Sequence, residues 1–121
     1  SEGLRARLEW IMREQRKSLR APIDIYLNKI IDEVRHLGRA RDISPDGIWV
    51  SKILEPRHDK RTIGLELQLP GIPEVINATG VIVREDRREE GPEGMAIRFT
   101  RIAQHHRRLI SLYVSRQAGT A

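Results

Sequence analysis

The sequence predicts a mainly β fold, a small six-stranded antiparallel β-barrel with an N-terminal helix and a C-terminal α-helix. Apolar and polar residues alternate in six short segments, which is the two-residue period of half-buried strands. Turn-forming residues separate these segments at short intervals, which favours antiparallel neighbours over parallel strands joined by helices. The first and last segments instead repeat every three to four residues, as amphipathic helices do.

The first half of the chain changes from a helical period to a strand period at a proline. Leu4, Leu8 and Ile11 form one helical stripe, with charged residues on the other faces. Pro22 ends that pattern because the residue before a proline is driven towards extended geometry. The expected elements are a helix over 4–15, a strand over 23–27, a strand from Val34 through 37–43 with a bulge or close contact at Gly38, a turn over 42–47 and a strand over 48–54.

The second half continues with strands and ends in a helix. Ile63, Leu65 and Leu67 alternate with polar or small residues, and a Leu-Pro-Gly turn follows them. A hairpin loop crowded with charges of both signs separates the last two strands. The expected elements are strands over 63–69, 75–83 and 95–99, a hairpin loop over 84–93 and a helix over 102–115, with Ile102, Leu109, Leu112 and Tyr113 on its apolar side.

Length and composition indicate one domain without disulfides. The 121 residues fit a single core, with residues 1–15 expected as a helical extension or linker and residues 16–118 as the domain. The absence of cysteine excludes disulfides, thiolate zinc sites and a cysteine nucleophile. No apolar run approaches the ~20 residues of a membrane helix. There is also no recognisable export signal, so the expected location is the cytoplasm.

The net charge of +5 is unevenly distributed. Residues 1–20 carry six basic and three acidic side chains, and residues 101–121 carry four arginines and no acid, whereas the middle of the chain is mildly acidic. Arginine accounts for 18 of the 22 basic residues. A coding bias explains that total, so the placement of individual arginines carries the information. Their planar forks match phosphates and guanine edges.

Enzymatic chemistry is poorly supported. There is no nucleophile elbow, no phosphate-cradling glycine loop and no metalloprotease helix motif. His105 and His106 are neighbours on an expected helix, so they point about 100° apart and are expected on the surface with basic partners. The carboxylates of the charged hairpin are interleaved with arginines. We therefore expect a binding module with no catalytic residue, no metal and no cofactor.

Two short segments stand out by position. Residues 16–20 read Arg-Lys-Ser-Leu-Arg at the junction of the first helix and first strand. Cations at a helix C-terminus are favoured by the macrodipole, which explains this segment without any ligand. Residues 42–47 read Asp-Ile-Ser-Pro-Asp-Gly, which by itself is an ordinary turn in which Gly47 takes a positive φ.

Together the two segments indicate a guanine-nucleotide site. Arginine forks would bond phosphates and the O6/N7 edge of guanine. The carboxylate of Asp42 would accept hydrogen bonds from the guanine N1–H and exocyclic amine. Gly47 would allow a close approach of the backbone.

The pairing of Arg-x-x-x-Arg with Asp-x-Ser-x-x-Gly resembles the PilZ domain, a bacterial receptor family for cyclic di-GMP. The likeness runs from about Arg16 to the final helix and includes the Leu-Pro-Gly turn and the segments 80–84 and 94–99. It implies a barrel that binds cyclic di-GMP on its outer surface, often as an intercalated dimer. Arginines 16 and 20 would hold phosphates and guanine, residues 42 and 44 would read a guanine edge, and residue 47 would shape the turn. The ligand-binding residues implied are Arg16, Lys17, Arg20, Asp42, Ser44 and Gly47.

The resemblance implies a cyclic di-GMP receptor module in bacterial second-messenger signalling, a context associated with motility and biofilm formation, and it leaves open which process is regulated. The ligand would order the segment 16–20 against the barrel and signal to an attached domain or to a protein partner, which is not identified. One alternative is a ligand-free PilZ-like scaffold in pilus or motility systems, and a further one is a small nucleic-acid-binding barrel. The stripe of residues 4, 8 and 11 is a candidate surface for a homodimer.

Overall fold

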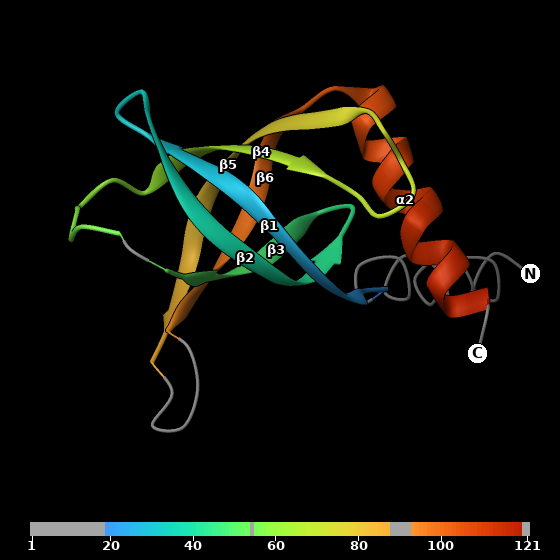
Figure 1. Ribbon diagram of the computed structural model, residues 1–121, viewed down its shortest axis with the longest axis horizontal. Coiled ribbons are helices and arrows are strands. Elements are labelled where there is room, and N and C mark those ends of the chain that lie inside the picture. The colour runs from blue at the N-terminus through green and yellow to red at the C-terminus, as the bar shows by residue number, and fades with distance from the viewer. Residues whose placement is uncertain (1–18, 54, 88–92, 120–121) are drawn as a thin grey trace, which may run out of the picture.

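The computed structural model describes residues 19–53, 55–87 and 93–119, and it has the predicted fold class. Six antiparallel strands form a closed barrel, and one helix follows them (Figure 1). The helix expected over 4–15 lies outside the described residues. The elements are β1 (Ala21–Ile31), β2 (Val34–Ser44), β3 (Gly47–Lys52), β4 (Thr62–Gln68), β5 (Val75–Asp86), β6 (Gly94–Ile102) and α2 (Gln104–Gly119).

The strand order around the barrel is β1-β2-β3-β6-β5-β4, and β4 closes it against β1. That closing pair is short, since only residues 28–30 of β1 have partners in β4. The β1–β2 hairpin reaches away from one end of the barrel, whereas α2 lies at the other end, near the start of β1 and the β2–β3 turn (Figure 1). The described residues of the two segments singled out in the sequence therefore belong to the end that carries α2.

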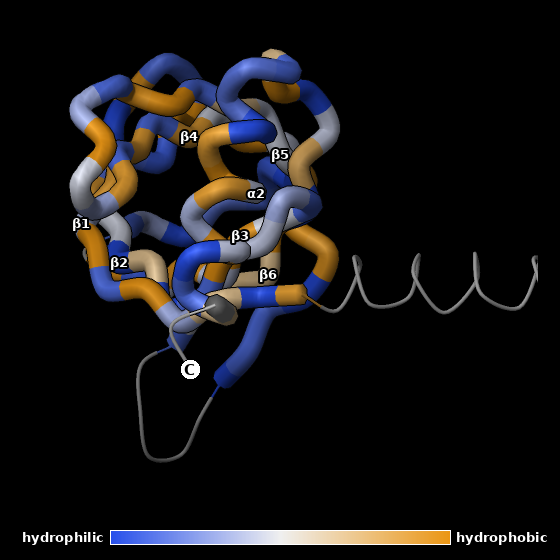
Figure 2. The backbone as a smooth tube through the Cα atoms, turned by 90° about the vertical axis from the view of Figure 1, so that its right-hand side faces the viewer, coloured by the Kyte–Doolittle hydropathy of each residue, from blue (hydrophilic) through white to orange (hydrophobic). Residues whose placement is uncertain are grey.

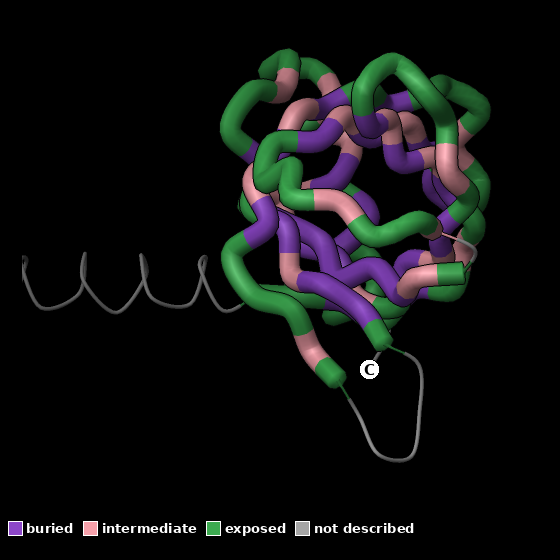
Figure 3. The backbone as a smooth tube through the Cα atoms, turned by 90° about the vertical axis from the view of Figure 1, so that its left-hand side faces the viewer, coloured by how far each residue is buried: buried purple, intermediate pink, exposed green. Residues whose placement is uncertain are grey.

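The core fills the interior of the barrel and the contact with α2. Apolar and polar residues alternate along the strands in the view from the α2 end (Figure 2), and the exposed residues gather on hairpins and loops in the view from the opposite end (Figure 3). Burial of each large aliphatic side chain stabilises the fold by about 1.5–3 kcal/mol. Residues with under 2% exposure include Ile43, Ile48, Val50, Ile63, Leu65, Ile76, Met95, Ile97, Ile110 and Val114.

Several predicted boundaries were too short. β1 continues to Ile31, and β5 runs on to Asp86, three residues beyond the prediction. The end of β1 carries the inward-pointing Lys29 and the end of β5 carries Arg84, Glu85 and Asp86, and these charges weaken the apolar signal without interrupting the ladder. The predicted close contact at Gly38 is confirmed, because a Cβ there would lie 2.8 Å from Val50 Cγ1.

The C-terminal helix begins later than predicted. Ile102 belongs to β6, where it pairs with Ala78 of β5, and α2 begins at Gln104. An apolar residue at this position satisfies both periods, so the sequence pattern alone does not separate strand from helix. Leu112 was also expected on the apolar side but is 45% exposed, because residues 110, 113 and 114 form the buried stripe instead.

One charged side chain lies inside the barrel. Lys29 points inward from β1 and is fully buried, with its Nζ 3.1 Å from Oε1 of Glu55 in the β3–β4 loop. The side chain of Glu55 is 1% exposed, and His58 of the same loop brings its Nε2 to 3.5 Å from that oxygen. This pair lies at the opposite end of β1 from Ala21.

Among the described residues, no helix is long and apolar enough to cross a membrane.

Candidate functional site

The structure brings the described parts of the two segments together. Nη1 of Arg20 donates to Oδ1 of Asp42 at 3.2 Å, across 22 residues of sequence. The two side chains are 45% and 40% exposed, so the ion pair faces solvent on the outer wall of the barrel. Arg16 and Lys17 lie outside the described residues. The site consists here of Arg20 and the turn that follows Asp42.

Strand register is what places Arg20 beside Asp42. Ala21 pairs with Ile43 and Pro22 with Asp42 in the β1–β2 ladder, so the residue before β1 reaches the end of β2. Both strands carry an irregularity here, between residues 22 and 25 of β1 and between residues 40 and 42 of β2. β-Bulges redirect side chains and are common beside functional sites.

The hydroxyl of Ser44 organises the β2–β3 turn. Its Oγ accepts hydrogen bonds from the backbone N–H of Asp46 at 3.2 Å and of Gly47 at 3.1 Å. Ser44 is fully buried, and its Oγ also lies 3.4 Å from the carbonyl oxygen of Gly47. In this conformation the hydroxyl holds the turn rather than facing outward. Short side chains that bond the backbone two or three residues ahead are typical of such turns.

Gly47 is required by close packing rather than by an unusual backbone angle. The expectation of a positive φ is wrong, since Gly71 is the one glycine with a positive φ among the described residues. A Cβ at Gly47 would overlap the backbone carbonyl oxygen of Ile97 in the neighbouring strand β6. Backbone cannot move aside as a flexible side chain can, so this position excludes any larger residue without a shift of β6.

Asp46 ties the turn to the rest of the barrel. Its carbonyl oxygen accepts a hydrogen bond from the N–H of Phe99 in β6 at 2.8 Å. Its carboxylate lies 3.5 Å from Nη1 of Arg107 in the first turns of α2. The helix also contacts the start of β1, where the hydroxyl of Tyr113 donates to the carbonyl oxygen of Pro22 at 3.4 Å. The turn is therefore held from two sides.

Arg98 is a site candidate that sequence reasoning missed. It lies directly opposite Gly47 in the β3–β6 ladder and is exposed between two buried neighbours, so it faces outward beside the turn. A free guanidinium there would add positive charge to the site. The alternation of residues 95–99 predicts that Arg98 faces outward, but only the long-range register places it opposite Gly47.

The wall next to the site carries a strong ion pair between β1 and β2. Nε and Nη2 of Arg39 donate to the two carboxylate oxygens of Asp24 at 2.6 and 2.7 Å. These hydrogen bonds lower the pKa of Asp24 and raise the pKa of Arg39. The Arg39 guanidinium also lies 5.8 Å from the ring centre of Tyr26, which is 62% exposed. Asp24 and Arg39 therefore already have each other as charged hydrogen-bond partners.

The two histidines of α2 have an acidic partner, which corrects the expectation of basic partners. Nε2 of His105 lies 2.7 Å and Nε2 of His106 3.6 Å from Oε2 of Glu74, in the β4–β5 connection. The sequence did not predict this partner because the contact depends on tertiary structure: that connection passes the start of α2.

In the part of the chain that the structure describes, no group of three or more acidic, histidine or cysteine side chains is arranged to hold a metal ion.

Trp49 is a buried anchor of the outer wall and not an open stacking platform. It is 7% exposed, its ring packs over Gly94, and its Nε1 donates to Oδ2 of Asp86 at 2.8 Å. The same carboxylate accepts from Arg84, which raises the pKa of that arginine.

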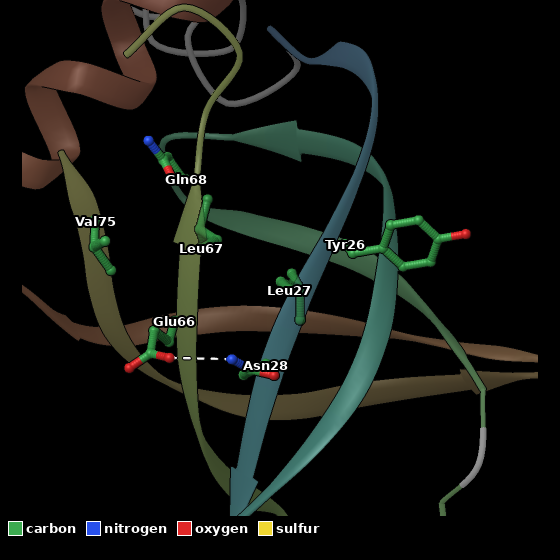
Figure 4. A pocket seen from close by; sticks show the side chains of 7 residues that line it. All are labelled: Tyr26, Leu27, Asn28, Glu66, Leu67, Gln68 and Val75. Carbon is green, nitrogen blue, oxygen red and sulfur yellow. Dashed lines mark hydrogen bonds between the residues drawn. The ribbon is translucent and has the colours of Figure 1, made fainter. Parts of the chain in front are cut away.

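A separate outer pocket lies where β1 and β4 diverge (Figure 4). Its volume is about 390 Å³, and Asn28 and Glu66, which are partners in the β1–β4 ladder, are joined by a hydrogen bond of 3.1 Å at its edge. Glu66 is also bonded by Arg35, so its charge is already compensated. Of the predicted site residues that the structure describes, none lines this pocket. The remaining lining residues are Tyr26, Leu27, Leu67, Gln68 and Val75.

Comparison with known proteins shows the family of this chain. The family model of the PilZ domain matches residues 14–116, so the chain belongs to the PilZ domain family. A search of curated proteins gives no match.

Two solved structures share the fold. The structure of the Bacillus subtilis inhibitor of motility, MotI/DgrA, aligns over 84% of this chain with a TM-score of 0.74 and 17% identity. The alignment covers 50% of that protein, so this chain spans about half of its length. An uncharacterised protein of Legionella aligns over 84% of this chain and 95% of its own, with a TM-score of 0.55 and 16% identity.

Proposed function

We propose that this protein is a cyclic di-GMP receptor module and that its ligand binds on the outer wall beside Arg20 and the β2–β3 turn. The observation that carries the proposal is the Arg20–Asp42 pair, which unites the family's two motifs at one exposed point. Membership of a receptor family supports the ligand class. The module acts by binding and not by catalysis.

The exposed ion pair is suited to exchange its partner for a ligand. Exposed pairs of this kind contribute about 0–1 kcal/mol to stability, so opening the pair requires little free energy. The guanidinium of Arg20 then bonds a phosphate or the guanine O6/N7 edge in two-point contacts. The freed carboxylate of Asp42 accepts from the guanine N1–H and amine. Each side chain thus gains a partner of matching charge or hydrogen-bonding pattern.

The other motif residues have different tasks. Arg16 and Lys17 supply further positive charge to the phosphates, with Lys17 as a point charge that lacks the planar fork of arginine. Ser44 and Gly47 keep the turn rigid and close to β6, which holds the end of β2, and with it Asp42, in place. Arg98 adds an exposed guanidinium opposite the turn. A rigid turn lowers the ordering cost of binding.

The signal arises from the segment before β1. Cyclic di-GMP draws residues 16–20 against the barrel, because phosphates and guanines bridge this segment to the β2–β3 turn. The ligand shifts the population towards the docked arrangement to the extent that it binds that arrangement more tightly. The docked segment changes how an attached domain or a protein partner is presented.

Calorimetric titration with cyclic di-GMP tests the proposal, with Arg20→Ala and Asp42→Ala as site variants and Arg57→Ala as control. Arg57 is exposed in the β3–β4 loop and has no ion-pair partner among the described residues. Both site variants should lose binding at least tenfold with unchanged circular dichroism, whereas the control should bind normally. Absence of heat from the unmodified chain, at concentrations that fill a roughly micromolar site, would refute the receptor function and favour the ligand-free scaffold.

A further inference from the structure

The outward face of α2 carries an arginine–leucine–arginine stripe. Residues 110, 113 and 114 are buried against the barrel, which fixes the rotation of the helix. Arg108, Leu112 and Arg116 are four residues apart, so they follow one another along the opposite side. All three are exposed, with Leu112 at 45%. They form a ridge about 12 Å long, at 1.5 Å per residue. We call this ridge the α2 stripe.

The charges of the α2 stripe have no counter-charge on the barrel. Arg35, Arg39 and Arg84 on the strands each face a carboxylate. Arg108 and Arg116, like the exposed strand residues Arg41, Arg98 and Arg101, have no ion-pair partner among the residues that the structure describes. There is no Asp or Glu between residues 104 and 119. A surface that served only for solubility would interleave charges of both signs, as the strands do.

Arg108 follows the first turn of α2 and gains nothing from the helix dipole, whereas Arg116 lies in the last turn, where a cation is favoured. The beginning of a helix is electropositive, and this helix has no acidic residue in its first turn. His105 and Arg107 compensate through Glu74 and Asp46 respectively, but Arg108 has no such contact within the described residues. Helix stability does not explain this residue.

We propose that the α2 stripe is a docking surface for an acidic segment of a partner protein, with two carboxylates on either side of an apolar side chain. Arginine pairs with carboxylates through two parallel hydrogen bonds, and Leu112 supplies the apolar contact between them. A helix with Glu, Leu and Glu at positions i, i+4 and i+8 matches the spacing of the stripe. The surface lies on α2 and uses none of the proposed ligand residues.

The composition of the stripe favours protein over the other polyanions. Single-stranded nucleic acids need aromatic side chains for base stacking, and the aromatic residue of α2, Tyr113, is buried. A membrane-surface helix needs a free apolar face, and the apolar face of α2 is buried against the barrel.

Fluorescence anisotropy with the full chain tests this docking surface. The probe is a labelled helical peptide with Glu, Leu and Glu at i, i+4 and i+8, compared with the same peptide carrying Gln in place of both Glu residues. At about 50 mM salt, where surface charges are weakly screened, the Glu peptide should bind at least tenfold more tightly than the Gln peptide. Arg108→Glu/Arg116→Glu should abolish this preference, whereas the control Arg57→Glu/Arg87→Glu, with the same change of charge, should keep it.

Further measurements separate the apolar contact and the competing ligands. Leu112→Ser should weaken binding several-fold without changing its salt dependence, because it removes contact area and no charge. Equal loss in the two double-charge variants, or equal binding of the Glu and Gln peptides, would overturn the proposal. Binding to phosphatidylserine vesicles or to a single-stranded oligonucleotide without binding to the Glu peptide would also overturn it, in favour of a membrane or nucleic-acid surface.

Discussion

The ion pair inside the barrel provides a sharp test of the packing described above. Lys29 is fully buried and Glu55 is 1% exposed, at a separation of 3.1 Å. Neither Nζ of Lys29 nor either carboxylate oxygen makes a hydrogen bond of good geometry within the described residues. The two charges therefore attract each other, but the pair lacks the additional hydrogen bonds that normally offset the free-energy cost of desolvation. The perturbation is Glu55→Gln, which keeps the shape and removes one charge.

The expected loss in the free energy of unfolding is about 3–5 kcal/mol, because the variant leaves an ammonium group buried without its counter-charge. That is a large fraction of the roughly 5–15 kcal/mol by which a domain is normally stable. Burial already lowers the pKa of Lys29 below 10.5, and Glu55 opposes this shift. Without Glu55 the pKa of Lys29 falls further. The unfolded state then binds more protons than the folded one, so the variant becomes more stable as pH rises towards the ordinary lysine pKa of 10.5.

Urea unfolding followed by circular dichroism measures both effects, with the double variant Lys29→Met/Glu55→Gln in the same series. Removing both charges should restore stability to within about 1–2 kcal/mol of the unmodified protein, since a buried ion pair is often replaceable by neutral groups. A loss below 1 kcal/mol for Glu55→Gln, or equal losses in the single and double variants, would refute the buried pairing. Cyclic di-GMP affinity serves as a control, because the pair lies at the other end of β1 from the proposed site.

Two further predictions concern the site and the wall. Gly47→Ala should destabilise the fold by about 1–3 kcal/mol and weaken cyclic di-GMP binding in calorimetry, because the new Cβ displaces the Ile97 carbonyl. The control is Gly71→Ala, at φ +77 with open space around it. It should destabilise the fold by about 1 kcal/mol and leave binding unchanged. Equal effects on binding would contradict this. Hydrogen bonds from Asn28 and Arg35 lower the pKa of Glu66 below its ordinary value of 4.5. The ionised carboxylate therefore stabilises the folded state above pH 4.5, and this stabilisation is lost as the pH falls through the lowered pKa. The urea midpoint of the unmodified protein should therefore fall more steeply below about pH 4.5 than that of Glu66→Gln, and parallel curves would contradict the assignment.

The sequence predicted the fold class because it depends on a local pattern. A two-residue apolar period identified the six strands, and the Asp-x-Ser-x-x-Gly spacing allowed Ser44 to bond the backbone three residues ahead. The start of α2 was misplaced because Ile102 fits either period. The histidine partners were misjudged because Glu74 comes from a connection about thirty residues away and not from the helix itself.

The sequence by itself determined the strand pattern, the composition of the turn and the concentration of positive charge near the chain ends. The tertiary structure decided which residues meet: Arg20 reaches Asp42 through the β1–β2 register, and Arg98 lies across from Gly47. It also decided why position 47 is glycine, since the Ile97 carbonyl occupies the space of a side chain. Periodicity and short hydrogen bonds are properties of neighbours along the chain, whereas register and closure of the barrel depend on how distant strands pair.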